Sequence, residues 1–248
     1  TRAGLDHDVA AEHRAVQAGT LEALMAGGYD GDTTLAELLR LGDLGIGTVQ
    51  ALDGELIIVD GRPYAAHADG SVTALSPLAR TPFAVITPFV ADATTTIETP
   101  LDFDGLHAAL DGLAAPDAPV LAVRVDGTFR DLVLRSVAKQ SHPYPPLAEV
   151  VQHQTEWRVE RATGTVVGFR FPDATAGLEV PGHHLHFLAD DHTLGGHVIS
   201  CGLERGTIAI DVCDDLHVEL PPGVDLGVPG AADRSQIASI EGGSHRGD

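Results

Sequence analysis

A histidine-rich segment in the last third of the chain constrains the fold more than any other feature. His184 and His186 are two residues apart, so on a β-strand both side chains point to the same face. The polar run 190–195 ends in a glycine pair and is typical of a hairpin loop, which places His197 on the return strand. With a six-residue loop, Leu188 would face His197. Because cross-strand partners share a face, all three histidines are predicted to lie on one side of one hairpin.

Three convergent histidines predict a metal site. A His-x-His pair alone is more often a solvated strand edge, but a third histidine on the same face favours a metal ion. Three histidines with an open position are typical of catalytic zinc sites, whereas structural zinc sites are closed by four protein ligands. His183, on the opposite face, and His192, in the loop, are not expected to be ligands. Imidazole ligands favour Zn²⁺, with iron, manganese, cobalt and nickel as alternatives.

Composition excludes several classes of partner. The chain has 248 residues, 44% of them hydrophobic, which is enough for one large domain or two ordinary ones. The net charge of −21 disfavours nucleic acids and anionic membranes, since both are bound by neutralising phosphates with Lys and Arg. The same negative field repels a small anionic substrate, so such a substrate requires a local arginine. The acidic excess, together with a single lysine, Lys139, also suggests a salt-adapted or high-GC source.

The cellular compartment is predicted from the lack of a membrane span, a signal peptide and a disulfide framework in the sequence. No apolar run reaches the roughly 18 residues needed to cross a bilayer, and no signal-peptide pattern opens the chain. The sequence leaves open whether a leader peptide preceded Thr1 and was removed. Cys201 and Cys213 do not form a disulfide framework and are expected to be small buried residues on neighbouring strands. We therefore expect a cytoplasmic protein.

The hydrophobic pattern predicts an α+β fold with two subdomains, built on mixed, largely antiparallel β-sheets with a few helices. Helices are expected at 8–26, 32–39, 102–113 and 147–152. Strands are expected at 45–52, 55–59, 83–87, 120–125, 129–137, 164–171 and 207–212, with hairpin turns at the Asp-Gly pairs 53–54 and 126–127. The proline-rich segment 141–146 is the predicted linker. It separates an N-terminal α/β subdomain, 1–140, from a metal-binding subdomain with a C-terminal tail, 141–248.

Five blocks of the sequence resemble α-acetolactate decarboxylases, in the same order along nearly the whole chain. They are Ala23–Gly31, Gly42–Thr48, Leu52–Leu56, Thr81–Ala84 and Gly182–Val198. The resemblance implies two α/β subdomains with a zinc site between them, and a homodimer. It also implies a carboxy-lyase that converts 2-acetolactate to acetoin and CO₂, in the acetoin and butanediol branch of pyruvate metabolism.

Carried over residue by residue, the resemblance makes His184, His186 and His197 the zinc ligands. It implies that Glu55, Arg135 and Glu241 are catalytic, and that Thr48 and Arg135 bind the substrate. A Lewis-acid metal stabilises the enolate that loss of CO₂ leaves behind. An arginine suits the carboxylate because its donors are bidentate, and a carboxylic acid suits protonation of the intermediate. Which of Glu55 and Glu241 donates the proton stays open.

Two other functional interpretations of the sequence compete with a decarboxylase. A cupin-like dioxygenase or isomerase also uses a His-x-His pair, with an acid that Asp190 would supply and a distant histidine. In this chain, however, the third histidine follows too soon, and the first 140 residues would go unexplained. A non-enzymatic assembly or DNA-binding domain of related fold is the second alternative. The net negative charge argues against DNA, and that reading leaves Glu55 and Arg135 without a role.

Overall fold

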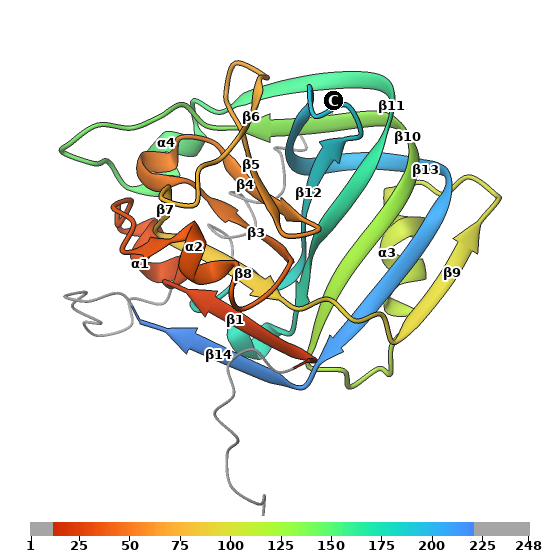
Figure 1. Cartoon of the computed structure of the whole chain (residues 1–248). Coiled ribbons are helices and arrows are strands. Elements are labelled where there is room, and N and C mark those ends of the chain that lie inside the picture. The colour runs from red at the N-terminus through yellow and green to blue at the C-terminus, as the bar shows by residue number, and fades with distance from the viewer. Residues whose placement is uncertain (1–11, 221–248) are drawn as a thin grey trace, which may run out of the picture.

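The structure, a computed structural model, describes residues 12–220 and contains two large β-sheets packed face to face (Figure 1). The first sheet is made of β1 (Arg14–Ala18), β3 (Leu44–Thr48), β4 (Glu55–Val59), β5 (Arg62–Ala66), β6 (Val72–Ala74), β8 (Phe83–Thr87) and β14 (Asp215–Glu219). Their order across the sheet is β14-β1-β8-β3-β4-β5-β6. All neighbours are antiparallel except β1 and β14, which are parallel.

Long strands build the second sheet. They are β9 (Ala93–Ile97), β10 (Val120–Ser136), β11 (Thr155–Phe171), β12 (Gly182–Ala189) and β13 (Gly195–Cys213), in the order β10-β11-β12-β13-β9. Because β10 also pairs with β13, the four strands β10 to β13 close into a ring. A two-stranded sheet joins β2 (Thr33–Thr34) to β7 (Arg80–Thr81).

Helices are few and short. They are α1 (Leu21–Met25), α2 (Leu35–Leu38), α3 (Phe103–Asp111) and α4 (Leu147–Val151), with 3₁₀ turns η1 (Gln50–Leu52) and η2 (Asp173–Thr175). Capping explains where α1, α2 and α3 begin, since the side chains of Thr20, Thr34 and Asp102 each accept a hydrogen bond from a backbone N–H in the first turn. Among the described residues no helix has the length and apolarity to span a membrane. The α+β prediction is confirmed.

Apolar side chains fill two main layers. Ile57 of the first sheet and Phe169 and Leu188 of the second belong to one buried cluster that joins the sheets. Leu106 and Leu110 of α3 are fully buried against the second sheet. Burial of such a side chain contributes ~1.5–3 kcal/mol, so these layers hold the two sheets and α3 in place.

The predicted helix 8–26 is wrong over most of its described part. Only Leu21–Met25 is helical, and Arg14–Ala18 forms β1, all five residues of which are buried. β1 lies between β8 and β14 and pairs with both. Tertiary strand pairing therefore outweighs the local helix propensity of this segment.

The predicted hairpin at Asp126-Gly127 is also wrong, because β10 runs through it without a turn. Gly127 lies opposite Gly206 of β13, and a Cβ atom at Gly127 would be 2.4 Å from the carbonyl oxygen of Arg205. The glycine thus permits close approach of two strands rather than a reversal of the chain.

The sheets do not divide the chain at the predicted linker. β9 and β10 precede residue 140 but belong to the second sheet, and β14 returns to the first. The division into subdomains at 140 therefore does not coincide with the boundary between the sheets, and stays a prediction. Cys201 and Cys213 are buried as expected but lie on one strand, β13, rather than on neighbouring strands.

Candidate metal centre and active site

The β12–β13 hairpin brings the three predicted ligands together with a register that differs from the expected one. Leu188 pairs with Gly195, and His186 lies directly opposite His197. The loop is therefore shorter than predicted, and Leu188 does not face His197. The conclusion about faces is unaffected, because His186 and Leu188 are two residues apart and point to the same side of β12.

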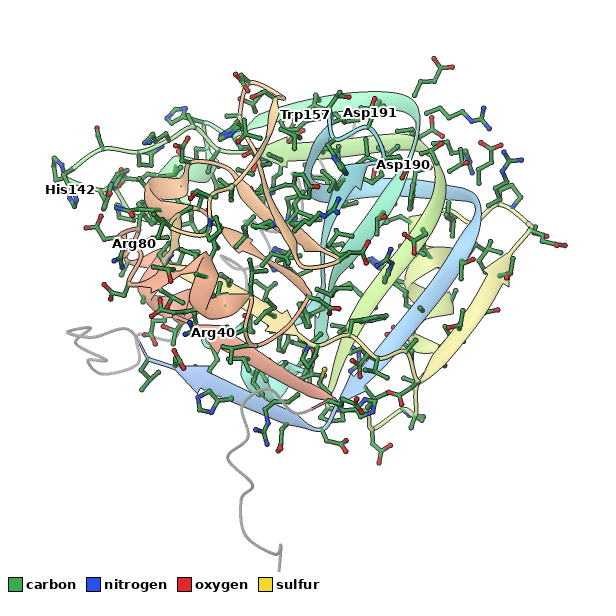
Figure 2. All side chains as sticks on the ribbon, viewed as in Figure 1. Arg40, Arg80, His142, Trp157, Asp190 and Asp191 are labelled. Carbon is green, nitrogen blue, oxygen red and sulfur yellow. The ribbon has the colours of Figure 1, made fainter. Side chains whose placement is uncertain are left out.

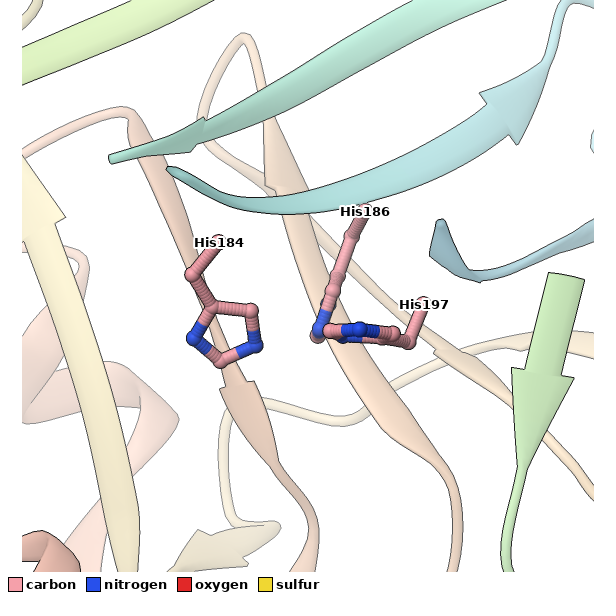
Figure 3. A group of neighbouring side chains, drawn as sticks. All are labelled: His184, His186 and His197. Carbon is pink, nitrogen blue, oxygen red and sulfur yellow. The ribbon is translucent and has the colours of Figure 1, made fainter. Parts of the chain in front are cut away.

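Figure 3 shows the imidazole rings of His184, His186 and His197 gathered on one side of the hairpin. Their ring centroids are 5.0–5.4 Å apart, and one ligand nitrogen from each lies within 4.8 Å of the others. All three side chains are buried, with residue exposures of 8%, 0% and 3% respectively. A buried set of three imidazoles fits a transition-metal ion such as Zn²⁺.

His186 and His184 have the properties that a ligand requires. The Nδ1 atom of His186 is 2.9 Å from the backbone carbonyl oxygen of Leu56 on β4, so Nδ1–H donates and Nε2 is the basic nitrogen. Burial, with the nearby Arg135 guanidinium, lowers the pKa of His184 to about 3. The ring is therefore neutral at physiological pH, which is the form that binds a metal.

Arg135 continues the row of predicted ligands on the neighbouring strand. β10 pairs with β13, and Arg135 lies directly opposite His197. The residues His186, His197 and Arg135 thus follow one another across three hydrogen-bonded strands, and cross-strand partners share a face. Gly196, with a φ of 151°, keeps β13 close to β10 here, since a Cβ atom would be 3.0 Å from the carbonyl oxygen of Arg135.

Glu55 approaches this row from the first sheet. It begins β4, directly after the Asp53-Gly54 turn. One carboxylate oxygen is 3.6 Å from Nε2 of His186, and the other is 3.9 Å from a guanidinium nitrogen of Arg135. The side chains of Glu55 and Arg135 are only 12% and 6% exposed. A carboxyl group, a guanidinium and three imidazoles therefore share one buried site.

A pocket opens between these polar groups and an apolar wall. Thr48 pairs with Glu55 across β3 and β4, and its hydroxyl donates to the carbonyl oxygen of Gly54 at 3.2 Å. The pocket is lined by Glu55, Thr48, Arg135, His184 and His197. The rest of the lining is mainly apolar and comes from Leu21, Leu24, Leu52, Phe83, Val137, Leu147, Val151 and Val180.

The pocket contains features that the sequence did not predict. Its apolar wall includes side chains of α1, α4 and the segment before β12, and none of these side chains was assigned to the site from the sequence. The carbonyl of Leu56 orients His186 through the backbone, so no side-chain pattern reveals it. Glu241 lies outside the described residues and its role stays a prediction.

Asp190, the acid that a cupin-like site would use, does not join the histidines. It lies on the exposed turn between β12 and β13, near Asp191 (Figure 2). His183 likewise points elsewhere, stacking on His107 and approaching Asp111 at 3.1 Å. The described residues contain a second group with metal-ligating atoms in close proximity, formed by His13, Asp92 and Asp211.

The chain is similar to known proteins in both sequence and structure. The family model for alpha-acetolactate decarboxylase matches residues 16–226. A protein from Methylococcus capsulatus named alpha-acetolactate decarboxylase is 42% identical over 210 residues, covering 85% of this chain and 81% of that protein. A protein of the same name from Klebsiella aerogenes is 38% identical over 205 residues, covering 83% and 79%.

A solved structure is similar across nearly its whole length. The crystal structure of alpha-acetolactate decarboxylase from Bacillus subtilis matches with a TM-score of 0.88 and 34% identity, covering 92% of this chain and 99% of that one. A match of this coverage includes both sheets and most of the first 140 residues, which a cupin-like interpretation leaves unexplained.

Proposed function

The chain belongs to the alpha-acetolactate decarboxylase family, and from this premise we propose that it is a metal-dependent carboxy-lyase that converts 2-acetolactate to acetoin and CO₂. The observation that carries the proposal is the convergence of three histidines, Arg135 and Glu55 on one pocket. Each of these groups meets a separate requirement of the reaction.

The reaction needs an acceptor for an electron pair. When the bond between C2 and the carboxylate breaks, CO₂ leaves and the electrons move onto the adjacent keto oxygen as an enolate. His184, His186 and His197 would hold the ion, which supplies Lewis acidity that stabilises this charge. Neutral histidine ligands leave the ion its full positive charge, which thiolate ligands would diminish.

Arg135 is proposed to bind the substrate carboxylate. Its guanidinium can donate two parallel hydrogen bonds, which fixes the orientation of the bond that breaks. The side chain lies at the pocket wall opposite His197, so the carboxylate would be held beside the ligand row. The local positive charge also offsets the net charge of −21 that repels an anionic substrate.

Glu55 is proposed to protonate C2 after CO₂ has left. Its carboxyl group lies between His186 and Arg135, within 3.6–3.9 Å of both, so it borders the place where the enolate forms. Proton transfer from a fixed carboxylic acid delivers the proton to one face of the intermediate. Glu241 stays the alternative donor that the family resemblance implies.

Thr48 and the apolar wall are proposed to shape the rest of the site. Thr48 lines the pocket next to Glu55, where its side chain would contact the substrate. The side chains of Leu21, Leu52 and Val180 would enclose the two methyl groups of acetolactate and keep water from the enolate.

The proposal also covers the oligomeric state, the metal, the cellular location and the partners. We propose a homodimer with Zn²⁺ as the metal, acting in the cytoplasm in the acetoin and butanediol branch. The small anionic substrate is the expected partner, and neither nucleic acid nor membrane is. The negative charge supports these exclusions, since both partners would repel it.

The test of the activity is acetoin formation. Purified protein loaded with zinc should convert racemic 2-acetolactate to acetoin and CO₂ far faster than the substrate decarboxylates in buffer. Acetoin at the spontaneous rate from metal-loaded protein would refute the proposal. Oxygen consumption with an iron-loaded sample would favour the cupin-like alternative instead.

A further inference from the structure

A second group of side chains that could bind a metal lies at the opposite end of β13 from the active-site pocket. It comprises His13, directly before β1, Asp92, directly before β9, and Asp211, near the end of β13. Nδ1 of His13 is 2.7 Å from a carboxylate oxygen of Asp211 and 3.5 Å from one of Asp92. Figure 1 shows the end of β13 beside the start of β1, at the opposite end of β13 from His197.

Charge in this group is unbalanced. The Asp211 side chain is 0% exposed, whereas those of His13 and Asp92 are 36% and 41% exposed. Within residues 12–220, His13 is the only cationic group at ion-pair distance from either carboxylate. One imidazolium can neutralise only one of the two carboxylates, so Asp92 brings a second negative charge toward the buried Asp211. A divalent ion would neutralise both carboxylates.

Backbone hydrogen bonds hold the two carboxylates toward each other. The N–H of Val90 donates to Asp211 at 3.0 Å, and the N–H of Val212 donates to Asp92 at 2.8 Å. Each aspartate is thus fixed by the segment that carries the other. The N–H of Asp214 also donates to the carbonyl oxygen of His13 at 3.0 Å, which ties the third residue to the end of β13.

We propose that His13, Asp92 and Asp211 form a second divalent-metal site, distinct from the catalytic histidines, with Zn²⁺ or Mn²⁺ as its ion. One imidazole and two carboxylates suit these ions, and water reaches the remaining coordination positions through the exposed sides of His13 and Asp92. The ion replaces the proton that His13 shares with Asp211.

The geometry requires only a small adjustment. Ligand atoms about 2.0–2.1 Å from a tetrahedral zinc ion are about 3.3 Å apart, so His13 and Asp211 would separate by about 0.6 Å. The half-exposed ring of His13 has space for this movement, while Asp211 stays fixed by Val90.

This site is proposed to stabilise the fold. It joins the residue before β1, the connection from β8 to β9 and the end of β13, which are distant in sequence. A ligand that binds only the folded chain stabilises it, and here it would do so by linking the start of β1 in the first sheet to the start of β9 and the end of β13 in the second.

The number of zinc ions that the full chain retains tests the proposal. Metal-stripped protein is equilibrated with Zn²⁺, passed through a column containing a weak competing chelator, and analysed by elemental mass spectrometry. The parent should retain a second zinc ion per chain beyond the catalytic one. Asp92→Asn should retain one ion fewer and keep its decarboxylase activity, because the asparagine oxygen can still accept from Val212.

Asp117→Asn is the matched control, since Asp117 is exposed and outside the group, and it should retain as much zinc as the parent. Zinc should also raise the Tm of the parent more than that of Asp92→Asn. A single retained ion in the parent, or equal zinc in the parent and Asp92→Asn, would overturn the proposal. The group would then be a hydrogen-bonded ion pair alone.

Discussion

At the scale of single residues, the proposed active site depends on one carboxyl group that faces both a proposed metal ligand, His186, and the guanidinium of Arg135. Glu55 is 3.6 Å from His186 and 3.9 Å from Arg135, although these residues come from opposite sheets. The two residues are proposed to have different tasks, namely protonation for Glu55 and carboxylate binding for Arg135. Substitutions that preserve shape separate the tasks.

Glu55→Gln should lower kcat by about 100- to 10,000-fold, the usual contribution of a positioned general acid, because the amide cannot donate the proton in its place. Metal content should stay at the parent level, since the histidines are unchanged. Glu160→Gln, on the exposed side of β11, is the matched control and should retain full activity. Steady-state kinetics with zinc analysis measures both, and a parental kcat in Glu55→Gln would remove Glu55 from catalysis.

Arg135→Lys should keep the positive charge but lose the two-pronged hydrogen bond to the carboxylate. We expect kcat/KM to fall by about 10- to 100-fold, in line with the ~1.5–3 kcal/mol of a hydrogen bond to a charged group. Arg158→Lys changes an exposed arginine on β11 in the same way and should behave as the parent. An unchanged kcat/KM in Arg135→Lys would contradict the proposed binding role.

At the scale of elements, the sequence predicted what depends on local periodicity and missed what depends on pairing. The strand Phe83–Thr87 and the helix α3 were predicted closely, because each has an uninterrupted pattern. The hairpin at Asp126-Gly127 was not correct, since a glycine that permits strand contact looks the same in sequence as one that permits a turn.

The candidate site shows the same division. The histidine face was predictable, because a spacing of two residues fixes a face whatever the register, and the register itself was wrong. The convergence of Glu55 with Arg135 could not be derived from spacing, since it depends on how two sheets pack. Only the family resemblance indicated those two residues.

Both cysteines of β13 should be unreactive in the folded protein. Burial raises the pKa of each thiol, Cys201 and Cys213, to about 12, so at pH 8 both are protonated and inaccessible. A thiol-reactive disulfide reagent should therefore label neither residue until the chain is unfolded in guanidinium. Thr193→Cys, on the exposed hairpin turn, should add one rapidly labelled thiol. Rapid labelling of the folded parent would show that β13 opens readily.

At the scale of the whole molecule, charge is the dominant unusual property. With a net charge of −21, the excess negative groups repel one another in the folded state. Salt screens this repulsion, because the screening length falls from ~30 Å at 0.01 M to ~8 Å at 0.15 M. Raising KCl over this range should therefore raise the Tm, by about 2–4 °C for each kcal/mol gained.

Differential scanning calorimetry in the presence of a chelator measures this effect without a contribution from metal binding. Near the sequence pI of about 4.7 the net charge vanishes, so the same salt series should have a much smaller effect there. A Tm that stays flat or falls with salt at neutral pH would contradict the expectation of salt adaptation.

The most direct test of the central claim is acetoin formation through a cycle of metal removal and return. Protein treated with a chelator should form acetoin from racemic 2-acetolactate only at the spontaneous rate, and Zn²⁺ should restore turnover. His197→Ala should stay inactive after the same addition, because it lacks one of the three ligands. Turnover that survives complete metal removal, or returns with zinc in His197→Ala, would contradict a reaction that depends on the three histidines.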